Sequence, residues 1–198
     1  HVRLVETYDV LAGAASDVEV RLGHFATIAS LFEERIGNLD QAFAYRARAF
    51  RDAPERAELV DQLLRVAEVR GSLDEGVLVL IEKVFEIEDE IRRKETHRTI
   101  ARVSRDKGID RELSKRHYAE ILRLDASDMD ALDALIRLHD EDGETGALVG
   151  LLAQKADLVV DPESRCELLL WAGDLYAGAL EKVDEAIGAF TGVLDMDP

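Results

Sequence analysis

The stretch Leu31–Pro54, LFEERIGNLDQAFAYRARAFRDAP, decides the fold, because its pattern returns as LYAGALEKVDEAIGAFTGVLDMDP at Leu175–Pro198. The two copies align without a gap at a constant offset of 144 residues. The offset pairs Leu31 with Leu175, Asp40 with Asp184, and Pro54 with Pro198. Self-similarity at a fixed period is typical of a solenoid, in which each helical hairpin buries its apolar face against a neighbour. The repeated stretch therefore predicts an array of stacked helical units.

Regularly spaced turn residues divide the chain between the two copies. Glycines expected at turns stand at positions 37, 71, 108 and 143, at intervals of 34, 37 and 35 residues. Glu181–Asp184 takes the corresponding place in the last copy. Apolar residues recur three and four positions apart on both sides of each turn, which predicts amphipathic helices. We find no alternating run rich in valine or threonine that would predict a strand.

We therefore expect one continuous all-α solenoid with eleven helices. Residues 1–15 form a helix left from a preceding repeat, and the repeats span 16–54, 55–90, 91–126, 127–162 and 163–198. The third repeat is divergent because its first helix is mostly polar. The chain begins with His1 where a full-length protein has Met, and it stops where a repeat closes, so we expect a fragment of a longer protein.

Helix starts are predicted from short local patterns. In a capping box, a serine hydroxyl and a glutamate carboxylate satisfy free backbone N–H groups at the start of a helix. Ser16 with Glu19 and Ser72 with Glu75 have this spacing. Pro54 is expected in the first turn of the next helix, where its missing N–H is no loss.

The charge of the chain limits its partners. A net charge of -17, with 42 Asp and Glu against 25 Lys and Arg, opposes binding to the phosphates of nucleic acid. The same charge attracts basic peptides or basic protein faces, although an acidic surface that serves only solubility is the alternative. No apolar run is long enough to predict membrane insertion, and the first 30 residues lack a signal-peptide pattern, so we expect a cytoplasmic protein.

The repeat resembles the tetratricopeptide repeat (TPR), which has a period near 34, small and aromatic residues in its first helix, and a closing proline. The last copy matches with Gly173, Tyr176, Ala186, Phe190 and Pro198. The first copy has Ala29, Phe32, Ala42, Arg46 and Pro54, so its arginine departs from the expected aromatic residue. With 19 Arg against 6 Lys, the chain also resembles the arrays of high-GC bacteria.

The resemblance implies about five antiparallel helix-turn-helix hairpins stacked in a right-handed superhelix. Its concave side would be lined by the first helix of each hairpin and would hold an extended peptide or a partner's helix. Members that grip a C-terminal carboxylate need Lys and Asn at two groove positions, where this chain has Ala26 and Ser30. The groove residues that the resemblance implies are Val60, Leu64, His97, Met129, Leu132, Ile136, His139 and Leu170.

The residue types that carry catalysis or bind metals form no recognisable pattern. The five histidines, at 1, 24, 97, 117 and 139, are never three or four residues apart, so no helix offers a two-histidine metal face. We find no glycine-rich phosphate loop. Cys166 lies on an apolar stripe and is expected to be a buried small hydrophobe rather than a nucleophile, and Trp171 is assigned equally to core or interface.

We therefore expect no cofactor and no enzymatic activity. The leading hypothesis is a non-catalytic scaffold that binds a peptide or helix of a partner protein in its groove. The alternative is a structural or self-associating spacer, because the uncapped ends of a solenoid expose apolar faces.

Overall fold

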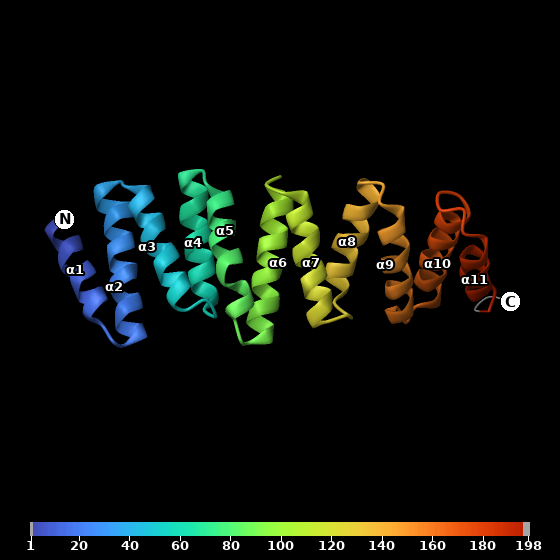
Figure 1. Ribbon diagram of the computed structural model, residues 1–198, viewed down its shortest axis with the longest axis horizontal. Helices are drawn as coiled ribbons and strands as arrows, with labels where there is room; N and C mark the ends of the chain where they lie inside the picture. Colours follow the sequence, from blue (N-terminus) through green and yellow to red (C-terminus); the bar gives the residue numbers. More distant parts are fainter. Residues whose placement is uncertain (1, 196–198) are drawn as a thin grey trace. The chain divides into compact units, whose positions relative to one another are not determined.

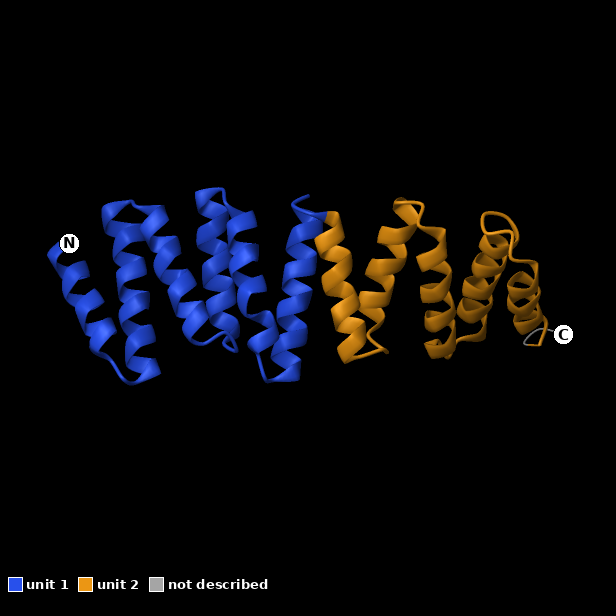
Figure 2. Cartoon of the chain, viewed as in Figure 1, with its two compact units in different colours: residues 1–110 blue, residues 111–198 orange. Residues whose placement is uncertain are grey.

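The computed structural model describes residues 2–195, which form consecutive helical hairpins (Figure 1). This range contains eleven α-helices, a π-helical segment and a 3-10 turn, with no β-strand. The predicted all-α hairpin architecture is confirmed. The helices fall into two compact units, unit 1 within residues 1–110 and unit 2 within residues 111–198 (Figure 2). The expected repeat bounds and the single continuous solenoid stay predictions.

Unit 1 contains six α-helices in its described residues, and each contacts the next along the chain. Its elements are α1 (Val2–Ala14), α2 (Val18–Ser30), the π-helix η1 (Leu31–Ile36), α3 (Leu39–Asp52), α4 (Ala57–Arg70), α5 (Leu73–Lys83), the 3-10 turn η2 (Val84–Glu86) and α6 (Glu90–Asp106). Helix α4 also contacts α6, and α3 contacts α5. Helices α4 and α6, each the first helix of its hairpin, therefore lie side by side, and so do α3 and α5, the second helices of theirs.

Unit 2 contains five α-helices in its described residues, again packed in chain order. They are α7 (Arg111–Leu124), α8 (Met129–Glu141), α9 (Thr145–Leu158), α10 (Pro162–Ala177) and α11 (Val183–Leu194). Within the described part of the chain, no helix has the length and apolar character needed to cross a membrane.

The predicted turn glycines end helices in the left-handed conformation. The φ angles of Gly37, Gly71, Gly108 and Gly143 are 74°, 79°, 63° and 69°. The next residue closes the turn, as where the Ser72 N–H donates to the Ala67 carbonyl at 2.8 Å. Glu181 takes the left-handed conformation in the last hairpin with a φ of 53°. The four predicted glycine turns are confirmed. In the last hairpin, α11 already begins at Val183, so Val183 and Asp184 of the predicted turn are helical.

The first predicted capping box is wrong by one residue. Helix α2 is capped by Asp17, whose Oδ1 accepts from the Glu19 N–H at 2.7 Å, and not by Ser16. Asp17 has an extended backbone, with φ −83° and ψ 127°, which is the conformation of an N-cap residue. The Asp17 carboxylate therefore has the capping role that was expected of the Ser16 hydroxyl.

Two further predicted helix starts also differ from the structure. Ser72 precedes α5, but its side chain makes no capping bond; its Oγ instead accepts a hydrogen bond from Arg70 Nη1 at 2.8 Å. Pro54 lies in the turn before α4, which begins at Ala57, so this proline is outside the first helical turn. The proline at a helix start is Pro162, the first residue of α10.

Apolar side chains from successive helices fill the interior of each unit. Phe50, Leu63 and Leu80 have no exposed surface in unit 1. In unit 2, Leu148 and Leu152 are buried in a cluster that also contains Ile136 and Ala172. Burying one such leucine contributes about 1.5–3 kcal/mol to stability. Stacking of hairpins therefore supplies the core that no single hairpin has.

Trp171, assigned equally to core or interface, and Cys166, expected to be buried, are both only partly buried. Trp171 is partly buried and packs against the Leu148–Leu152 cluster, so it belongs to the core side of α10. Cys166 is also only partly buried, which corrects the expectation of a buried thiol.

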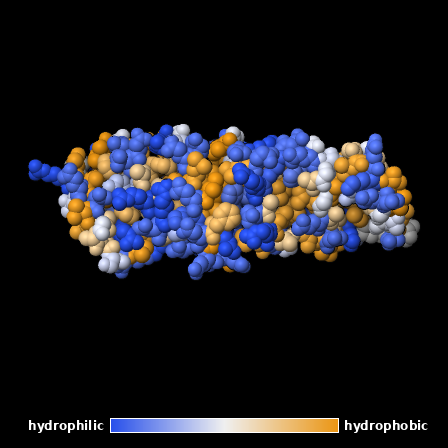
Figure 3. Space-filling view, in the orientation of Figure 1, coloured by the Kyte–Doolittle hydropathy of each residue, from blue (hydrophilic) through white to orange (hydrophobic). Residues whose placement is uncertain are grey.

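Figure 3 shows hydrophilic surface interrupted by apolar patches. Exposed apolar side chains of unit 1 include Leu78, Phe85 and Ile91.

Candidate functional site

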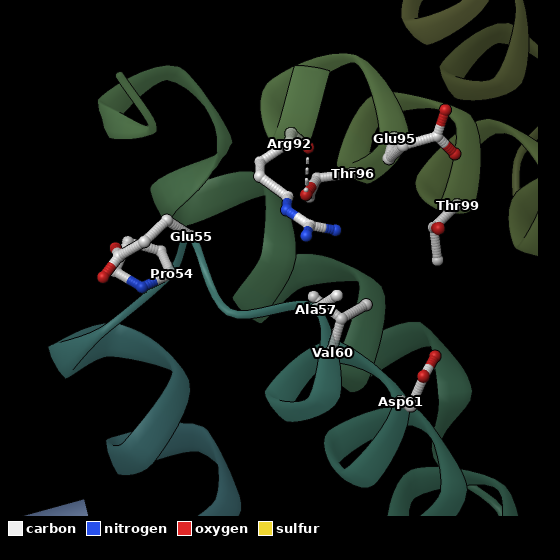
Figure 4. Close-up of a pocket in the computed structure, with 9 residues that line it drawn as sticks. All are labelled: Pro54, Glu55, Ala57, Val60, Asp61, Arg92, Glu95, Thr96 and Thr99. Atoms are coloured by element: carbon white, nitrogen blue, oxygen red, sulfur yellow. Dashed lines mark hydrogen bonds between the residues drawn. The ribbon is translucent and has the colours of Figure 1, made fainter. Parts of the chain in front are cut away.

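A pocket of about 220 Å³ lies between the first helices α4 and α6 of unit 1 (Figure 4). Helix α4 and the turn before it supply five of its lining residues, and α6 supplies four. The lining residues are Pro54, Glu55, Ala57, Val60, Asp61, Arg92, Glu95, Thr96 and Thr99. We call this the α4–α6 pocket.

Helical spacing brings these side chains to facing surfaces. Positions 92, 95, 96 and 99 recur at three- and four-residue intervals and therefore share one face of α6, as do 57, 60 and 61 on α4. Val60 is 6% exposed and Thr96 is 5% exposed, so they form the floor. The Thr96 hydroxyl donates to the Arg92 carbonyl at 3.0 Å, which satisfies its polar group within the helix.

The rim of the α4–α6 pocket is charged. Three carboxylates, from Glu55, Asp61 and Glu95, surround a single guanidinium, that of Arg92. Figure 4 shows the Arg92 side chain pointing from α6 toward α4. Glu95 pairs with Arg98, whereas Glu55, Asp61 and the Arg92 guanidinium form no ion pair within residues 2–195. These three charged groups are therefore available to a ligand. The net charge of the pocket, with Glu95 included, is negative.

The groove residues predicted in unit 1 have three different environments. Val60 lines the α4–α6 pocket. Leu64 is half-buried and packs toward α5, where a Cβ on Gly76 would lie 3.2 Å from its Cδ2. His97 is fully buried, with its ring edge-on to Phe85 at a centroid distance of 5.2 Å. A partner could contact His97 only after the side chains that cover this residue had moved. Its assignment to a groove therefore stays a prediction.

The predicted groove residues of unit 2 are also unequal. Met129 and Leu170 are 37% and 44% exposed. Leu132 is fully buried and Ile136 is 7% exposed, so both pack inside the unit and offer little surface to a partner. His139 is half-buried, with Nδ1 2.6 Å from Glu144 Oε2. Their common role in a groove therefore stays a prediction.

Unit 2 has a more apolar hollow of about 600 Å³ that the sequence did not indicate. Helices α7, α8 and α9 line it, with Leu122, Leu135 and Leu151 as its larger apolar residues and His139 at its rim. Ala119, Ala147 and Gly150 leave the space open because their side chains are small. Small residues on second helices are common in helical hairpins, so their sequence pattern gave no sign of a hollow.

Lys115 of α7 gathers three carboxylates that could otherwise hold a metal ion. Oxygen atoms of Glu112, Asp142 and Glu144 lie within 4.8 Å of one another. The Lys115 Nζ is 2.8, 2.6 and 2.7 Å from these three groups, and its side chain is 6% exposed. The ammonium group therefore occupies the position of the cation. Its hydrogen bonds lower the pKa of Asp142 and of Glu144, and these bonds outweigh burial to raise the pKa of Lys115.

Arg46 of α3 is a second buried cation. Within residues 2–195 it forms no ion pair, although Glu33 and Glu34 attract it electrostatically. The residue is 8% exposed and reaches both neighbouring first helices. Its Nη1 donates to Gln62 Oε1 of α4 at 2.5 Å, and its Nη2 donates to Ser30 Oγ of α2 at 3.4 Å. Its Nε donates to no acceptor within the described residues. Burial lowers the pKa of Arg46, since it disfavours the charged form.

Glu33, one of the two carboxylates that attract Arg46, forms an ion pair with another residue. Arg65 of α4 donates to both oxygens of Glu33 in a bidentate pair, at 2.5 and 2.7 Å. This hydrogen bonding lowers the pKa of Glu33. The sequence identified Arg46 only as a departure from the repeat pattern, because its partners are 16 residues away on each side.

Comparisons with known proteins find distant structural likenesses only. No protein-family model matches the chain, and no curated protein matches it. A solved structure of the MamA protein is 16% identical, with a TM-score of 0.46 over 89% of this chain and 91% of that one. YrrB, described as a TPR protein with an unusual peptide-binding site, is 16% identical, with a TM-score of 0.45 over 88% of this chain and 86% of its own.

A MamA segment from Desulfovibrio magneticus RS-1 is 16% identical, with a TM-score of 0.38 over 89% of this chain and 94% of that one. These likenesses are too distant to place a binding site on this chain. The hairpins themselves, with turn glycines 34 to 37 residues apart, carry the assignment. The architecture of this chain is that of a TPR-like helical repeat protein.

Proposed function

We propose that this chain is a non-catalytic protein-interaction scaffold that holds a segment of a partner protein on the first helices of its hairpins. The observation that carries this proposal is the α4–α6 pocket, which combines a buried floor of Val60 and Thr96 with three charged groups, Glu55, Asp61 and Arg92, that no described residue pairs. An apolar floor with a polar rim is the usual anatomy of a protein–protein contact.

The size and charge of the α4–α6 pocket favour a basic peptide segment. Its volume of about 220 Å³ is smaller than the roughly 300–1,000 Å³ of pockets that enclose a whole small ligand. It accommodates one or two side chains of a longer chain. Three carboxylates against one guanidinium favour a Lys or Arg side chain, which can insert its apolar stem above Val60 and place its charge beside Asp61.

Binding to an array of short randomised peptides in basic, neutral and acidic classes tests the proposal. We expect the basic class to be retained. Ala57→Arg, which fills the pocket, and Asp61→Lys, which reverses a rim charge, should each weaken the retained peptides by about tenfold or more, a loss of about 1.4 kcal/mol. Glu6→Lys is the matched control, because it makes the same change of charge on α1.

Two results would contradict the proposal. One is equal retention of the three peptide classes. The other is equal loss of binding in Asp61→Lys and Glu6→Lys, which would assign the effect to net charge rather than to the pocket. Thermal melts of the three variants establish that each remains folded before binding is compared.

A structural or self-associating spacer is the second proposal. The observation that bears on it is the apolar surface of α11, where Val183, Ile187 and Leu194 are 65%, 58% and 65% exposed. Light scattering at increasing protein concentration tests it. A constant monomeric mass over the whole range would contradict self-association.

A further inference from the structure

Another hollow of unit 1, with a volume of about 300 Å³, lies among α1, α2 and α3. Its floor is formed by Ala12 and Phe25, which are 1% and 4% exposed. Its charged lining residues are Arg21, Arg48, Arg51 and Asp52. We call this the arginine hollow. Three guanidiniums face a single carboxylate on its wall, so a small anion meets a locally positive surface although the chain has a net charge of -17.

The arginine hollow is separate from the groove positions of the first helices. Successive residues of a helix are about 100° apart around its axis. Arg21 and Phe25 therefore lie on a different side of α2 from Ser30, one of the expected groove positions. The other charged lining residues belong to α3, the second helix of its hairpin. The hollow thus offers a ligand a place that the groove does not include.

Two of the guanidiniums are fixed at the wall of the arginine hollow by other lining residues. Arg21 pairs with Asp52, and its Nη1 donates to the Ala15 carbonyl at 3.1 Å. The Cζ atom of Arg48 lies 4.9 Å from the centre of the Phe25 ring. Side chains that are already held in this way lose little conformational freedom when a ligand binds.

Each of the three arginines keeps N–H groups that no acceptor within residues 2–195 receives. Arg48 donates only from Nη1, which is 3.1 Å from Asp9 Oδ1, and Arg51 donates only from Nε, which is 2.7 Å from Glu82 Oε2. Neither of these carboxylates lines the hollow, so they leave its interior open. Arg21 donates from Nε and Nη1 and keeps Nη2. The hollow therefore combines space for a ligand with several charged donors.

We propose that the arginine hollow binds a phosphate monoester. A phosphate group has a charge of about −1.5 to −2 and three strong acceptor oxygens, so it can accept from guanidiniums of two helices at once. A carboxylate is planar and is matched by the fork of one arginine. The phosphate belongs either to a phosphorylated serine or threonine of a protein or to a small metabolite. This inference goes beyond the proposed function, because its site is separate from the α4–α6 pocket and its ligand has the opposite charge.

Nuclear magnetic resonance titrations of the intact chain test this directly. The probes are the amide of N-acetylphosphoserine and glycerol phosphate, which represent the two sources of the phosphate. The α-amide of N-acetylglutamate, which has one carboxylate, is the control ligand. We expect the Hε resonance of Arg48 to move downfield in a saturable way with the phosphates. The Hε resonance of Arg70 should not move, because its Nε already donates to Asp40 at 2.6 Å.

Gly13→Glu and Gly13→Gln form a matched pair of variants. Gly13 lines the arginine hollow, and a Cβ at this position would meet nothing within 4 Å. The two new side chains are of nearly equal size, but only glutamate adds a negative charge beside the site. Gly13→Glu should weaken phosphate affinity, measured from the backbone amide of Ala15, by about tenfold or more, and Gly13→Gln should weaken it much less.

Arg48→Gln should also weaken phosphate affinity by about tenfold or more, because it removes a charged donor. Arg65→Gln is its control, since Arg65 is an exposed arginine of unit 1 that is likewise paired with one carboxylate, that of Glu33. This variant should bind phosphate as the wild type does. Thermal melts establish that all four variants are folded.

Three results would overturn the proposal. The first is the absence of a saturable shift at Arg48 and Ala15 with both phosphates, and the second is equally tight binding of the glutamate probe. The third is an equal effect of the two Gly13 variants together with an equal effect of Arg48→Gln and Arg65→Gln. Tighter binding of the phosphoserine probe assigns the site to a phosphorylated protein, and tighter binding of glycerol phosphate assigns it to a metabolite. None of these outcomes depends on the peptide-array experiment, which probes the α4–α6 pocket.

Discussion

The chain has two buried cations, Lys115 and Arg46, whose hydrogen-bond partners differ in charge. Lys115 is surrounded by three carboxylates, so its cost of burial is offset inside the protein. Among the described residues, Arg46 donates only to the neutral acceptors Gln62 and Ser30, and its Nε has no acceptor. A buried charge that is surrounded by opposite charges costs the fold less than one whose hydrogen-bond partners are neutral. The three surrounding carboxylates therefore give Lys115 a structural role.

Lys115→Met tests the structural role. The substitution keeps an apolar stem but leaves Glu112, Asp142 and Glu144 repelling one another, so the apparent melting midpoint at pH 7 should fall by roughly 2–6 °C. The pKa values of Asp142 and Glu144 are lowered in the folded chain, so the stability that they contribute is present at neutral pH and lost as pH falls through those values. The difference between wild type and variant should therefore shrink in acid.

Lys107→Met is the control for that measurement, because Lys107 forms one exposed pair with Glu68. A pair of this kind contributes little, and its loss should barely move the midpoint. Calorimetry between pH 3 and pH 7 compares the two variants. An equal effect of both substitutions, or a Lys115 effect that grows in acid, would contradict the role given to Lys115.

Neither buried cation could have been identified from the sequence. Lys115 meets Asp142 and Glu144 at separations of 27 and 29 residues, and only packing of α7 against the end of α8 brings them together. The sequence did place Val60 at a groove position, and Val60 lines the α4–α6 pocket. It could not identify Arg92 as the facing cation, because that depends on which turn of α6 lies against α4.

At the scale of the element, helix ends were more predictable than helix starts. A glycine with positive φ is a strong local signal, and all four turn glycines have this conformation. A start depends on which of two adjacent polar residues has an extended backbone, as for Asp17 and Ser16. Both side chains can accept the same N–H bond, so the residue types alone do not decide which of the two is the cap.

Gly37→Ala should destabilise unit 1 by about 1–2 kcal/mol, because a Cβ is strained in the left-handed conformation. The φ of Gly37 is 74°, and no atom would touch the new methyl group, so the whole effect comes from the backbone. Gly23→Ala, within α2 and equally uncrowded, should instead stabilise by about 0.5–1 kcal/mol. Chemical denaturation of both variants checks the opposite signs, and a shared sign would contradict this account of the turns.

Gly173→Ala tests the close approach of α10 and α11. A Cβ at this position would lie 2.5 Å from Cε1 of Phe190, so the ring must move, at a cost of about 1–3 kcal/mol. Gly188→Ala on α11 meets nothing within 4 Å and should not destabilise. Hydrogen exchange of the α10–α11 hairpin measures both. Unchanged protection in Gly173→Ala would mean that the small residue at this repeat position is not required for packing.

At the scale of the whole molecule, the acidic charge is unevenly divided along the chain. Residues 111–198 have 20 Asp and Glu against 8 Lys and Arg, whereas residues 1–110 have 22 against 17. The α4–α6 pocket lies in the nearly balanced unit 1, where specific pairs matter more than net charge. The excess in residues 111–198 acts at longer range, as a field that attracts basic partners.

The negative field of these carboxylates predicts how the binding of a basic peptide depends on salt concentration. The range of electrostatic attraction falls from about 30 Å at 0.01 M salt to about 8 Å at 0.15 M. The association rate constant of a basic peptide from the array should therefore fall by about tenfold or more over this range, while its dissociation rate changes less. Asp61→Lys should mainly raise the dissociation rate, because Asp61 acts at contact distance. Stopped-flow fluorescence separates the two rates, and an association rate constant that does not respond to salt would show that the net charge of -17 serves solubility and not partner capture.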